Sequence, residues 1–368
     1  MDNWRPAHLL WQVSVTNVTG PRSAPSIWWW AFGYFACYVP YAALTKALTG
    51  GLVETGDTPV GGTEILPPSV MAAVATLIIF LLATGWWRKA RTVEIAGLKI
   101  PRPGNLQILS GLCSSGIIAT TTLAYTFKGV SIVFVMLLMR GGVLVMAPII
   151  DRFTGRKVRW FSWMGLALSL SSLVVAFLFD KKRGGDLTLL CAIDVAFYLG
   201  FYFVRLSLMS RLAKSNEPGA NLRYFVEEGM VSAPALLVLL GLGALFLGGD
   251  PGDQLRAGFT TFWDRPVVLE GLAIGALSQG TGICGGLIFL DKRENTFCVP
   301  VNRASSVLAG LVSSYWLYLA YDYRRVPNNE LWGAMLIIGA IVFLTIPPML
   351  QTRRLKARAR EASPPRGP

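Results

Sequence analysis

The sequence predicts an all-α polytopic membrane protein, with ten transmembrane helices arranged as two inverted five-helix repeats. The first observation behind this prediction is composition: 53% of the 368 residues are apolar and only 15% are charged, against about 25% charged in a typical soluble domain. The second is that the apolar residues fall in runs of roughly 20, enough to cross a hydrocarbon core of about 30 Å. The third is an order of features that occurs twice along the chain.

The connections between the apolar runs are short, so we expect one compact antiparallel bundle. The first run begins at Ile27 and is longer than the apolar core of a cleaved signal peptide. Its start carries Trp28, Trp29 and Trp30, as an interfacial aromatic belt would. We therefore expect this run to be retained, with residues 1–26 as a cytoplasmic segment. The predicted spans are 27–49, 67–87, 106–127, 129–150, 161–180, 187–208, 224–248, 267–290, 296–320 and 330–350.

The distribution of lysine and arginine predicts the orientation, because cytoplasmic loops are enriched in both. The loop 50–66 has neither residue, and a Lys-Lys-Arg cluster at 181–183 is the main exception outside. Both termini are expected in the cytoplasm, and we expect the net charge of +13 to reflect inside loops rather than nucleic-acid binding. The lack of targeting signals favours the cell membrane (plasma or inner). The basic inside segments are 88–102, 152–159, 211–223, 292–293 and the tail 351–368.

The repeat is visible where Leu123–Val145 is laid against Leu287–Gly310. In both, a span rich in small residues ends at a short charged turn, and an apolar helix follows with one arginine and then small residues. Both then lead through a loop to a Trp-Gly-type start of another span. An odd number of spans per repeat turns the second copy upside down, which places a substrate site near the midplane between the copies. The predicted repeats are 27–180 and 187–350.

Arg140 and Arg303 are the single charged residues of the two apolar helices matched in this way, 129–150 and 296–320. A charge at membrane depth costs about 2.5–3.5 kcal/mol on insertion scales, so it normally faces the bundle interior or a wet cavity. A guanidinium group binds phosphate or carboxylate through two parallel hydrogen bonds. The two arginines therefore predict a site for an anionic group. The alternative is a structural arginine bonded to backbone carbonyls or to an acidic neighbour, and Arg303 could also snorkel to the cytoplasmic end of its helix.

The stretch MLLMRGGVLVMAPIIDRFTGRKVRWFSWMGLALSLSSLVVAF closes the first repeat with an apolar helix, a short basic turn and a glycine-containing last helix. Together with the two five-span halves, it resembles the drug/metabolite transporter superfamily from about Ile27 to Leu350. A basic residue in the fourth and ninth spans is similar to the nucleotide-sugar and sugar-phosphate translocator branches. The resemblance implies that Arg140 and Arg303 contact substrate phosphate. The sugar-phosphate pattern has Lys-Arg in the ninth span, where this chain has Asn302-Arg303.

Further polar residues are candidates for the substrate site. One face of the sixth span carries Asp194, Tyr198, Tyr202 and Arg205, which either line the cavity or form a polar seam. Lys46 follows Tyr34, Tyr38 and Tyr41, and a cation near aromatic rings suits a sugar or a nucleobase. The alternative is that Lys46 extends to the membrane interface near the end of its helix. Gln279 and Tyr125 belong to the candidate set, and Ser278, Gln279 and Thr281 mirror serines and threonines of the third span.

Glu227 and Glu228 begin the seventh span. They are candidates for proton coupling, although they could instead complement the helix dipole or pair with Arg205.

The sequence offers few residues for ATP hydrolysis, metal binding or catalysis. There is no GxxxxGK[ST] loop for ATP hydrolysis, His8 is the single histidine, and the five cysteines form no CxxC pair. We therefore expect no cofactor, no metal site and no enzymatic activity. The expected function is a secondary transporter or exchanger of a small, anionic organic metabolite by alternating access, working in the lipid bilayer as a monomer or homodimer. The alternatives are an exporter of apolar or cationic compounds, a membrane-embedded enzyme such as a lipid-head-group transferase, and a non-transporting scaffold.

Overall fold

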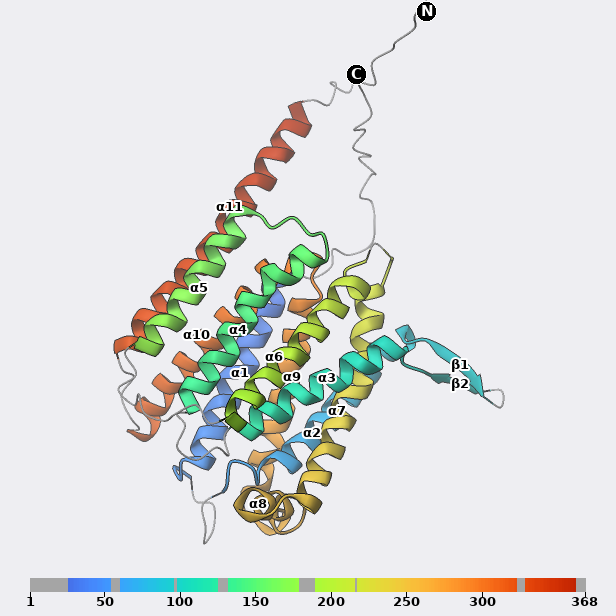
Figure 1. Ribbon diagram of the computed structural model, residues 1–368, viewed down its shortest axis with the longest axis vertical. Coiled ribbons are helices and arrows are strands. Elements are labelled where there is room, and N and C mark those ends of the chain that lie inside the picture. Colours follow the sequence, from blue (N-terminus) through green and yellow to red (C-terminus); the bar gives the residue numbers. More distant parts are fainter. Residues whose placement is uncertain are drawn as a thin grey trace, which may run out of the picture.

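A helical bundle with one small β-hairpin forms the protein in the computed structural model (Figure 1), which describes residues 26–53, 60–95, 98–124, 132–178, 189–215, 217–322 and 328–361. A helix lies at each of the ten predicted apolar segments. The helices are α1 (Ile27–Thr49), α2 (Leu66–Thr84), α3 (Asn105–Ala124), α4 (Ile132–Phe153), α5 (Trp160–Leu178), α6 (Leu189–Leu208), α7 (Ala220–Phe246), α8 (Gly249–Phe259), α9 (Val268–Phe289), α10 (Asn295–Tyr321) and α11 (Asn328–Glu361).

The surface of the bundle has the character of a membrane protein. Large apolar side chains point outward, among them Ile79, Leu245 and Leu269 at 65–77% exposure, while buried polar residues lie inside. Within the described residues, five helical segments are long and apolar enough to cross a membrane: Leu66–Thr84, Leu189–Ala213, Ala220–Phe246, Val268–Phe289 and Leu331–Pro348. The fold is therefore that of a mainly α-helical membrane protein, and ten crossings stay a prediction.

Three features depart from the predicted elements. The strands β1 (Thr92–Ile95) and β2 (Leu98–Pro101) form an antiparallel hairpin where only a basic loop was expected, within a fold that is otherwise helical. The apolar residues of this segment alternate with polar ones, which is the period of a strand. A short helix, α8, follows α7, and α11 continues to Glu361, into the segment predicted as a tail.

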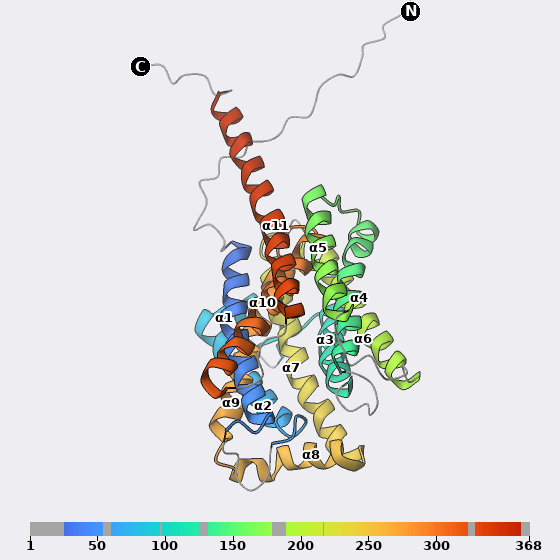
Figure 2. The same cartoon turned by 90° about the vertical axis from the view of Figure 1, so that its left-hand side faces the viewer.

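The helix contacts bring four helices together at the centre. Helix α1 packs on α9 and α10, and α6 packs on α3 and α4, while α4 and α10 contact each other. Around them, α2 packs on α7 and α9, α3 packs on α7, and α5 packs on α11. The pairing of α5 with α11 is visible from two directions (Figures 1 and 2). Helices α4 and α10 therefore meet at the centre of the bundle, with α6 and α1 packed beside them.

Two glycines allow close helix contacts in this arrangement. On α3, a Cβ at Gly111 would lie 2.7 Å from the Cβ of Val231 and 3.0 Å from the carbonyl oxygen of Glu228 on α7. On α9, a Cβ at Gly275 would clash with the carbonyl oxygen of Ser69 on α2. Small residues at such contacts let membrane helices pack backbone against backbone.

Candidate substrate site

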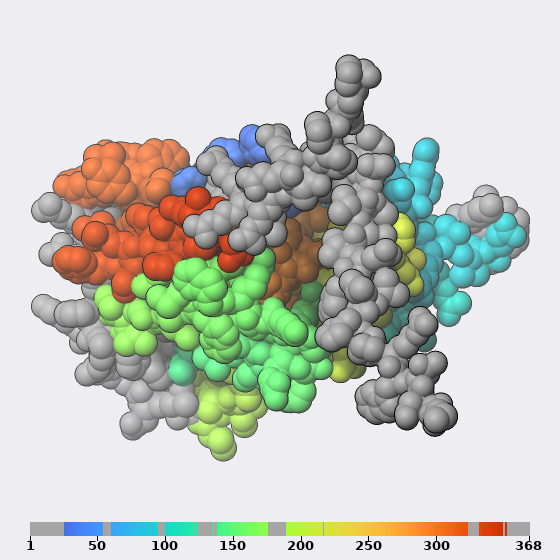
Figure 3. Space-filling model, turned by 90° about the horizontal axis from the view of Figure 1, so that it is seen from above, coloured from blue at the N-terminus to red at the C-terminus, as the bar shows by residue number. Residues whose placement is uncertain are grey.

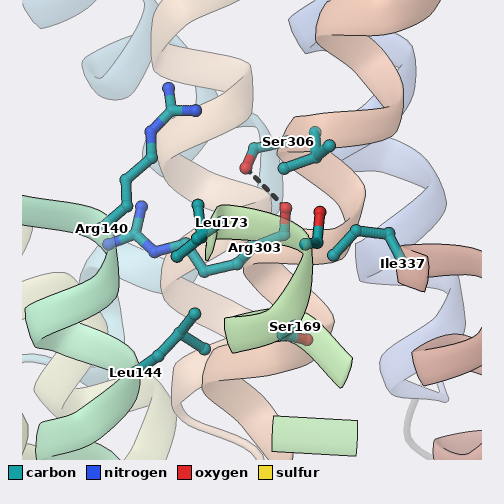
Figure 4. A pocket seen from close by; sticks show the side chains of 9 residues that line it. Arg140, Leu144, Ser169, Leu173, Arg303, Ser306 and Ile337 are labelled. Carbon is teal, nitrogen blue, oxygen red and sulfur yellow. Dashed lines mark hydrogen bonds between the residues drawn. The ribbon is translucent and has the colours of Figure 1, made fainter. Parts of the chain in front are cut away.

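Arg140 and Arg303 enter the same small space between packed helices. Each is the ninth residue of its helix, counting from Ile132 in α4 and from Asn295 in α10. Figure 4 shows both side chains at a pocket lined by residues of α4, α5, α10 and α11. The pocket holds about 10 Å³, room for about one water molecule, so the space is closed in this conformation. Its other lining residues are Leu144, Ser169, Ser172, Leu173, Ser306, Val307 and Ile337.

The guanidinium of Arg303 is held by a tyrosine rather than by a carboxylate. Its Nη2 donates a hydrogen bond to the hydroxyl of Tyr202 at 3.2 Å, and its central carbon lies 5.5 Å from the centre of the Tyr202 ring. Its Nε is buried and has no acceptor in the described part of the chain. A buried donor without a partner costs about 1–3 kcal/mol, so this arginine has binding capacity that the protein does not use.

Arg140 is even less engaged: among the described residues it makes neither a hydrogen bond nor an ion pair. Arg303, which lines the same pocket, contacts Tyr202 of α6. A Cβ at Gly285 would lie 3.1 Å from Tyr34 of α1 and 3.2 Å from the side chain of Asn302, which precedes Arg303. Tyrosines from α1 and α6 therefore lie close to this part of α10.

These tyrosines form two similar pairs at i and i+4. On α1, the rings of Tyr34 and Tyr38 are stacked with their centres 5.6 Å apart. On α6, the rings of Tyr198 and Tyr202 have their centres 5.0 Å apart, and both side chains are buried. Aromatic faces next to guanidinium groups suit a ligand that combines an anionic group with a ring.

Two other enclosed arginines of the described chain have carboxylate partners. Arg205 binds Glu228 at 2.6 Å, with the two side chains only 15% and 6% exposed. Arg265 binds Glu64 at 2.8 Å with similar enclosure. Arg205, although predicted on the same helix face as Tyr202, is thus part of an ion pair rather than an unpaired cation. Arg140 and Arg303 differ from these two arginines in having no carboxylate partner among the described residues.

Asp194 shares the buried face of α6 with Tyr198 and Tyr202 but makes no polar contact with the arginines. The residue is 3% exposed, and both carboxylate oxygens are buried with no hydrogen-bond partner among the described residues. Ionising an unpartnered carboxyl group in such a position is costly. Asp194 therefore stays a candidate for function, at a distance from Tyr202 of about 12 Å along the helix axis.

Three predicted site residues are not brought to the arginines. Lys46 is exposed near the end of α1 and lies about 18 Å along the axis from Tyr34. Gln279 is partly buried on α9, and no contact between it and the arginines is present in the described part of the chain. Tyr125 lies outside the described residues.

The two glutamates predicted for coupling both have well-defined partners. Glu227, fully buried, accepts hydrogen bonds from the backbone N–H of Arg91 at 3.0 Å and of Gly104 at 3.1 Å. It thereby ties both ends of the β-hairpin to α7. Glu228 accepts hydrogen bonds from Arg205, from Ser110 at 3.0 Å and from Ser114 at 2.7 Å. These contacts join α3, α6 and α7 and favour structural roles for both carboxylates.

A polar cluster that the sequence did not reveal closes the end of the bundle where α10 begins. The carboxylate of Asp151, fully buried at the end of α4, accepts four hydrogen bonds at 2.6–2.9 Å from the backbone N–H groups and side chains of Asn295 and Thr296. Lys214 donates to the side-chain oxygen of Asn295 at 3.0 Å, and Asn295 donates to Ser210 at 2.7 Å. We call Asp151, Ser210, Lys214, Asn295 and Thr296 the polar latch.

An ion pair reinforces the latch beside it. Arg159 donates two hydrogen bonds at 2.9 Å to the two carboxylate oxygens of Glu294, and Ser162 donates a third at 2.7 Å. Burial alone would raise the pKa of Glu294, but the hydrogen bonds from Arg159 and Ser162 hold it below its usual value. The start of α5 is therefore fixed to the start of α10 while Glu294 is ionised.

Comparison with known proteins supports the fold and nothing finer. No protein-family model and no curated protein matches the chain. A solved crystal structure is similar with a TM-score of 0.55 and 14% sequence identity, over 89% of this chain and 98% of that one. At this identity the likeness extends to the fold alone, and it covers nearly the whole bundle.

Proposed function

We propose that the protein is a secondary transporter or exchanger of a small organic metabolite that carries an anionic group. The observation that carries this proposal is the pair of arginines in the middle of the bundle, Arg140 and Arg303, for which no described carboxylate provides a countercharge. An anion entering between them would provide both the charge and the hydrogen-bond acceptors that they lack.

The packing of the helices supports two repeats that meet at this site. Each helix of the first half has a counterpart in the second half: α6 for α1, α7 for α2, α9 for α3, α10 for α4 and α11 for α5. When each helix is replaced by its counterpart, the list of the main helix contacts stays the same. The contact of α1 with α10 becomes that of α6 with α4, and that of α2 with α9 becomes that of α7 with α3. Tyr34 and Tyr198, Tyr38 and Tyr202, and Gly111 and Gly275 match at one constant sequence separation. Inverted repeats with a site at their interface are the architecture of alternating access.

The polar latch supports a gate at one end of the site. It joins the end of α4 to the start of α10, the two helices that carry the arginines. With the space at the arginines closed to about 10 Å³, substrate exchange requires these helices to separate. In the predicted orientation the latch is on the cytoplasmic side, and release of the latch would open the site to the cytoplasm.

The remaining parts of the proposal follow the sequence. Ten spans with both termini in the cytoplasm of a cell membrane, a monomer or homodimer, and a relationship to the drug/metabolite transporter superfamily all agree with this arrangement. The second candidate function is an exporter of cationic or apolar compounds. It is favoured by Asp194, whose buried and unpartnered carboxylate is suited to a positive charge.

The charge of the ligand separates these two candidates. Purified protein should gain thermal stability from members of a metabolite panel that carry phosphate or carboxylate groups, because a ligand of the folded state raises its melting temperature. Neutral and cationic analogues of the same size should leave the melting temperature unchanged. Stabilisation by cations with no response to anions would favour the exporter instead.

A further inference from the structure

A second polar pocket lies outside the bundle core, at the base of the β-hairpin. The hairpin projects from the side of the bundle (Figure 3), and the pocket between it and the start of α3 has a volume of about 470 Å³. We propose that this pocket binds the phosphate-bearing headgroup of an anionic phospholipid. Its lining residues are Arg91, Thr92, Val93, Arg102, Pro103, Gly104, Asn105, Leu106, Gln107 and Leu212.

Two arginines give the pocket its positive charge. Arg91 and Arg102 flank the hairpin, and the N–H of Arg102 donates to the carbonyl of Arg91 at 2.7 Å, which brings the two residues together. The side chain of Arg102 is exposed and has no ion-pair partner among the described residues. The side chain of Arg91 is 55% exposed, with its Nε 3.8 Å from the carboxylate of Glu227. Two guanidinium forks at one pocket suit a phosphate group.

The start of α3 adds uncharged donors. Helix α3 is 20 residues long, and its first turn, from Asn105 to Gln107, lines the pocket. The N–H groups of a first turn have no partner within their own helix, and they favour an anion. Gln107 is an independent sign of a ligand: its side chain is only 4% exposed, lines the pocket, and has no hydrogen bond within the described chain.

The pocket is held open by contacts beneath it. Glu227 binds the backbone at Arg91 and Gly104 and so fixes both ends of the hairpin on α7. A Cβ at Gly104 would clash with Gln107 and would lie 3.1 Å from Nη1 of Arg91. Only a glycine leaves this space free. A rigid, pre-formed shape reduces the entropic cost of binding.

The surroundings favour a lipid over a soluble phosphate. The segment Trp86–Lys89 directly precedes the pocket and has the tryptophans and basic side chains of a membrane interface. Leu106 lines the pocket, and Leu109 and Leu112 continue from it along α3, all three 44–49% exposed. This apolar strip would receive an acyl chain while the headgroup binds the arginines. Basic segments on the cytoplasmic side attract anionic lipids in the same way.

The test uses purified full-length protein in detergent and titration with phosphatidylglycerol or phosphatidylcholine, followed by native mass spectrometry. We expect wild type to retain phosphatidylglycerol preferentially, and Arg102→Ala to weaken this binding about tenfold or more, since a charge-assisted contact is lost. Lys89→Ala is the matched control: it removes a nearby exposed charge that does not line the pocket, and it should change the affinity by less than twofold. Arg102→Lys, which keeps the charge without the fork, should be intermediate.

Three results would overturn the proposal. Equal retention of both lipids would exclude a headgroup site, and equal effects of Arg102→Ala and Lys89→Ala would reduce the pocket to general surface charge. The third result comes from titrating the same variants with inorganic phosphate. If it binds with the same dependence on Arg102 while phosphatidylglycerol does not, the ligand is a soluble phosphate and not a lipid. A melting temperature for each variant shows that the fold is intact.

Discussion

Replacing Glu228 by glutamine should lower the free energy of unfolding by about 3–5 kcal/mol, because it leaves a buried guanidinium without its counter-ion. Arg205, 15% exposed, is 2.6 Å from the Glu228 carboxylate, and Ser110 and Ser114 donate to the same oxygen. The contacts connect α3, α6 and α7, so the loss should reach the whole bundle. The melting temperature of the purified variant in detergent measures it.

Asp194→Asn is the matched control, since it also changes a buried carboxylate to an amide. Asp194 has no hydrogen-bond partner to lose, so the melting temperature should stay the same or rise. If Glu228→Gln proves as stable as wild type, the pair with Arg205 is not structural. A coupling role for Glu228, as the sequence allowed, would then be the better explanation.

Opening of the latch should follow from Asp151→Asn. An amide accepts the four hydrogen bonds from the start of α10 poorly, because one of the two carboxylate oxygens becomes a donor. We expect a loss of about 2–4 kcal/mol in the closed state. The native thiol of Cys298 reports this directly: it is fully buried, 3.7 Å from the Lys214 ammonium. Its alkylation rate, followed by mass spectrometry, should rise about tenfold or more.

The control for this experiment is Asp253→Asn, at an exposed carboxylate far from the latch. Labelling of Cys113, buried elsewhere on α3, should stay unchanged in Asp151→Asn. If both thiols respond equally, the variant has loosened the whole protein, and the latch is not a separate gate.

The sequence predicted the helices better than the elements between them. Runs of about 20 apolar residues are a strong signal, and a helix lies at each predicted run. The hairpin at 92–101 has strands of only four residues, which give a weak alternating pattern. The segment 88–102 was therefore interpreted from its basic residues alone, as a cytoplasmic loop. Helix α8 lies in a polar stretch, for which hydropathy gives no signal.

The candidate site was predictable in part, for a physical reason. A lone arginine in an apolar helix can be recognised in the sequence, and helical spacing places Tyr198 and Tyr202 on one face of the sixth span. Partners from distant segments are not visible in this way. The four acceptor contacts of Asp151 with Asn295 and Thr296, and the binding of Glu227 to the hairpin, depend on the packing of helices far apart in sequence. Tyr34 was associated with Lys46, its neighbour on the chain, rather than with the arginines.

The most direct test of the anion site is the affinity of Arg140→Ala and Arg303→Ala for the anionic ligand that most stabilises wild type, measured together with their melting temperatures. Each variant should bind about 10–150-fold more weakly, because a charge-assisted contact worth about 1.5–3 kcal/mol is lost. Arg140→Lys should restore only part of the affinity, since lysine keeps the charge without the two-pronged geometry. Unchanged affinity in folded protein would contradict the account: both arginines would then be structural.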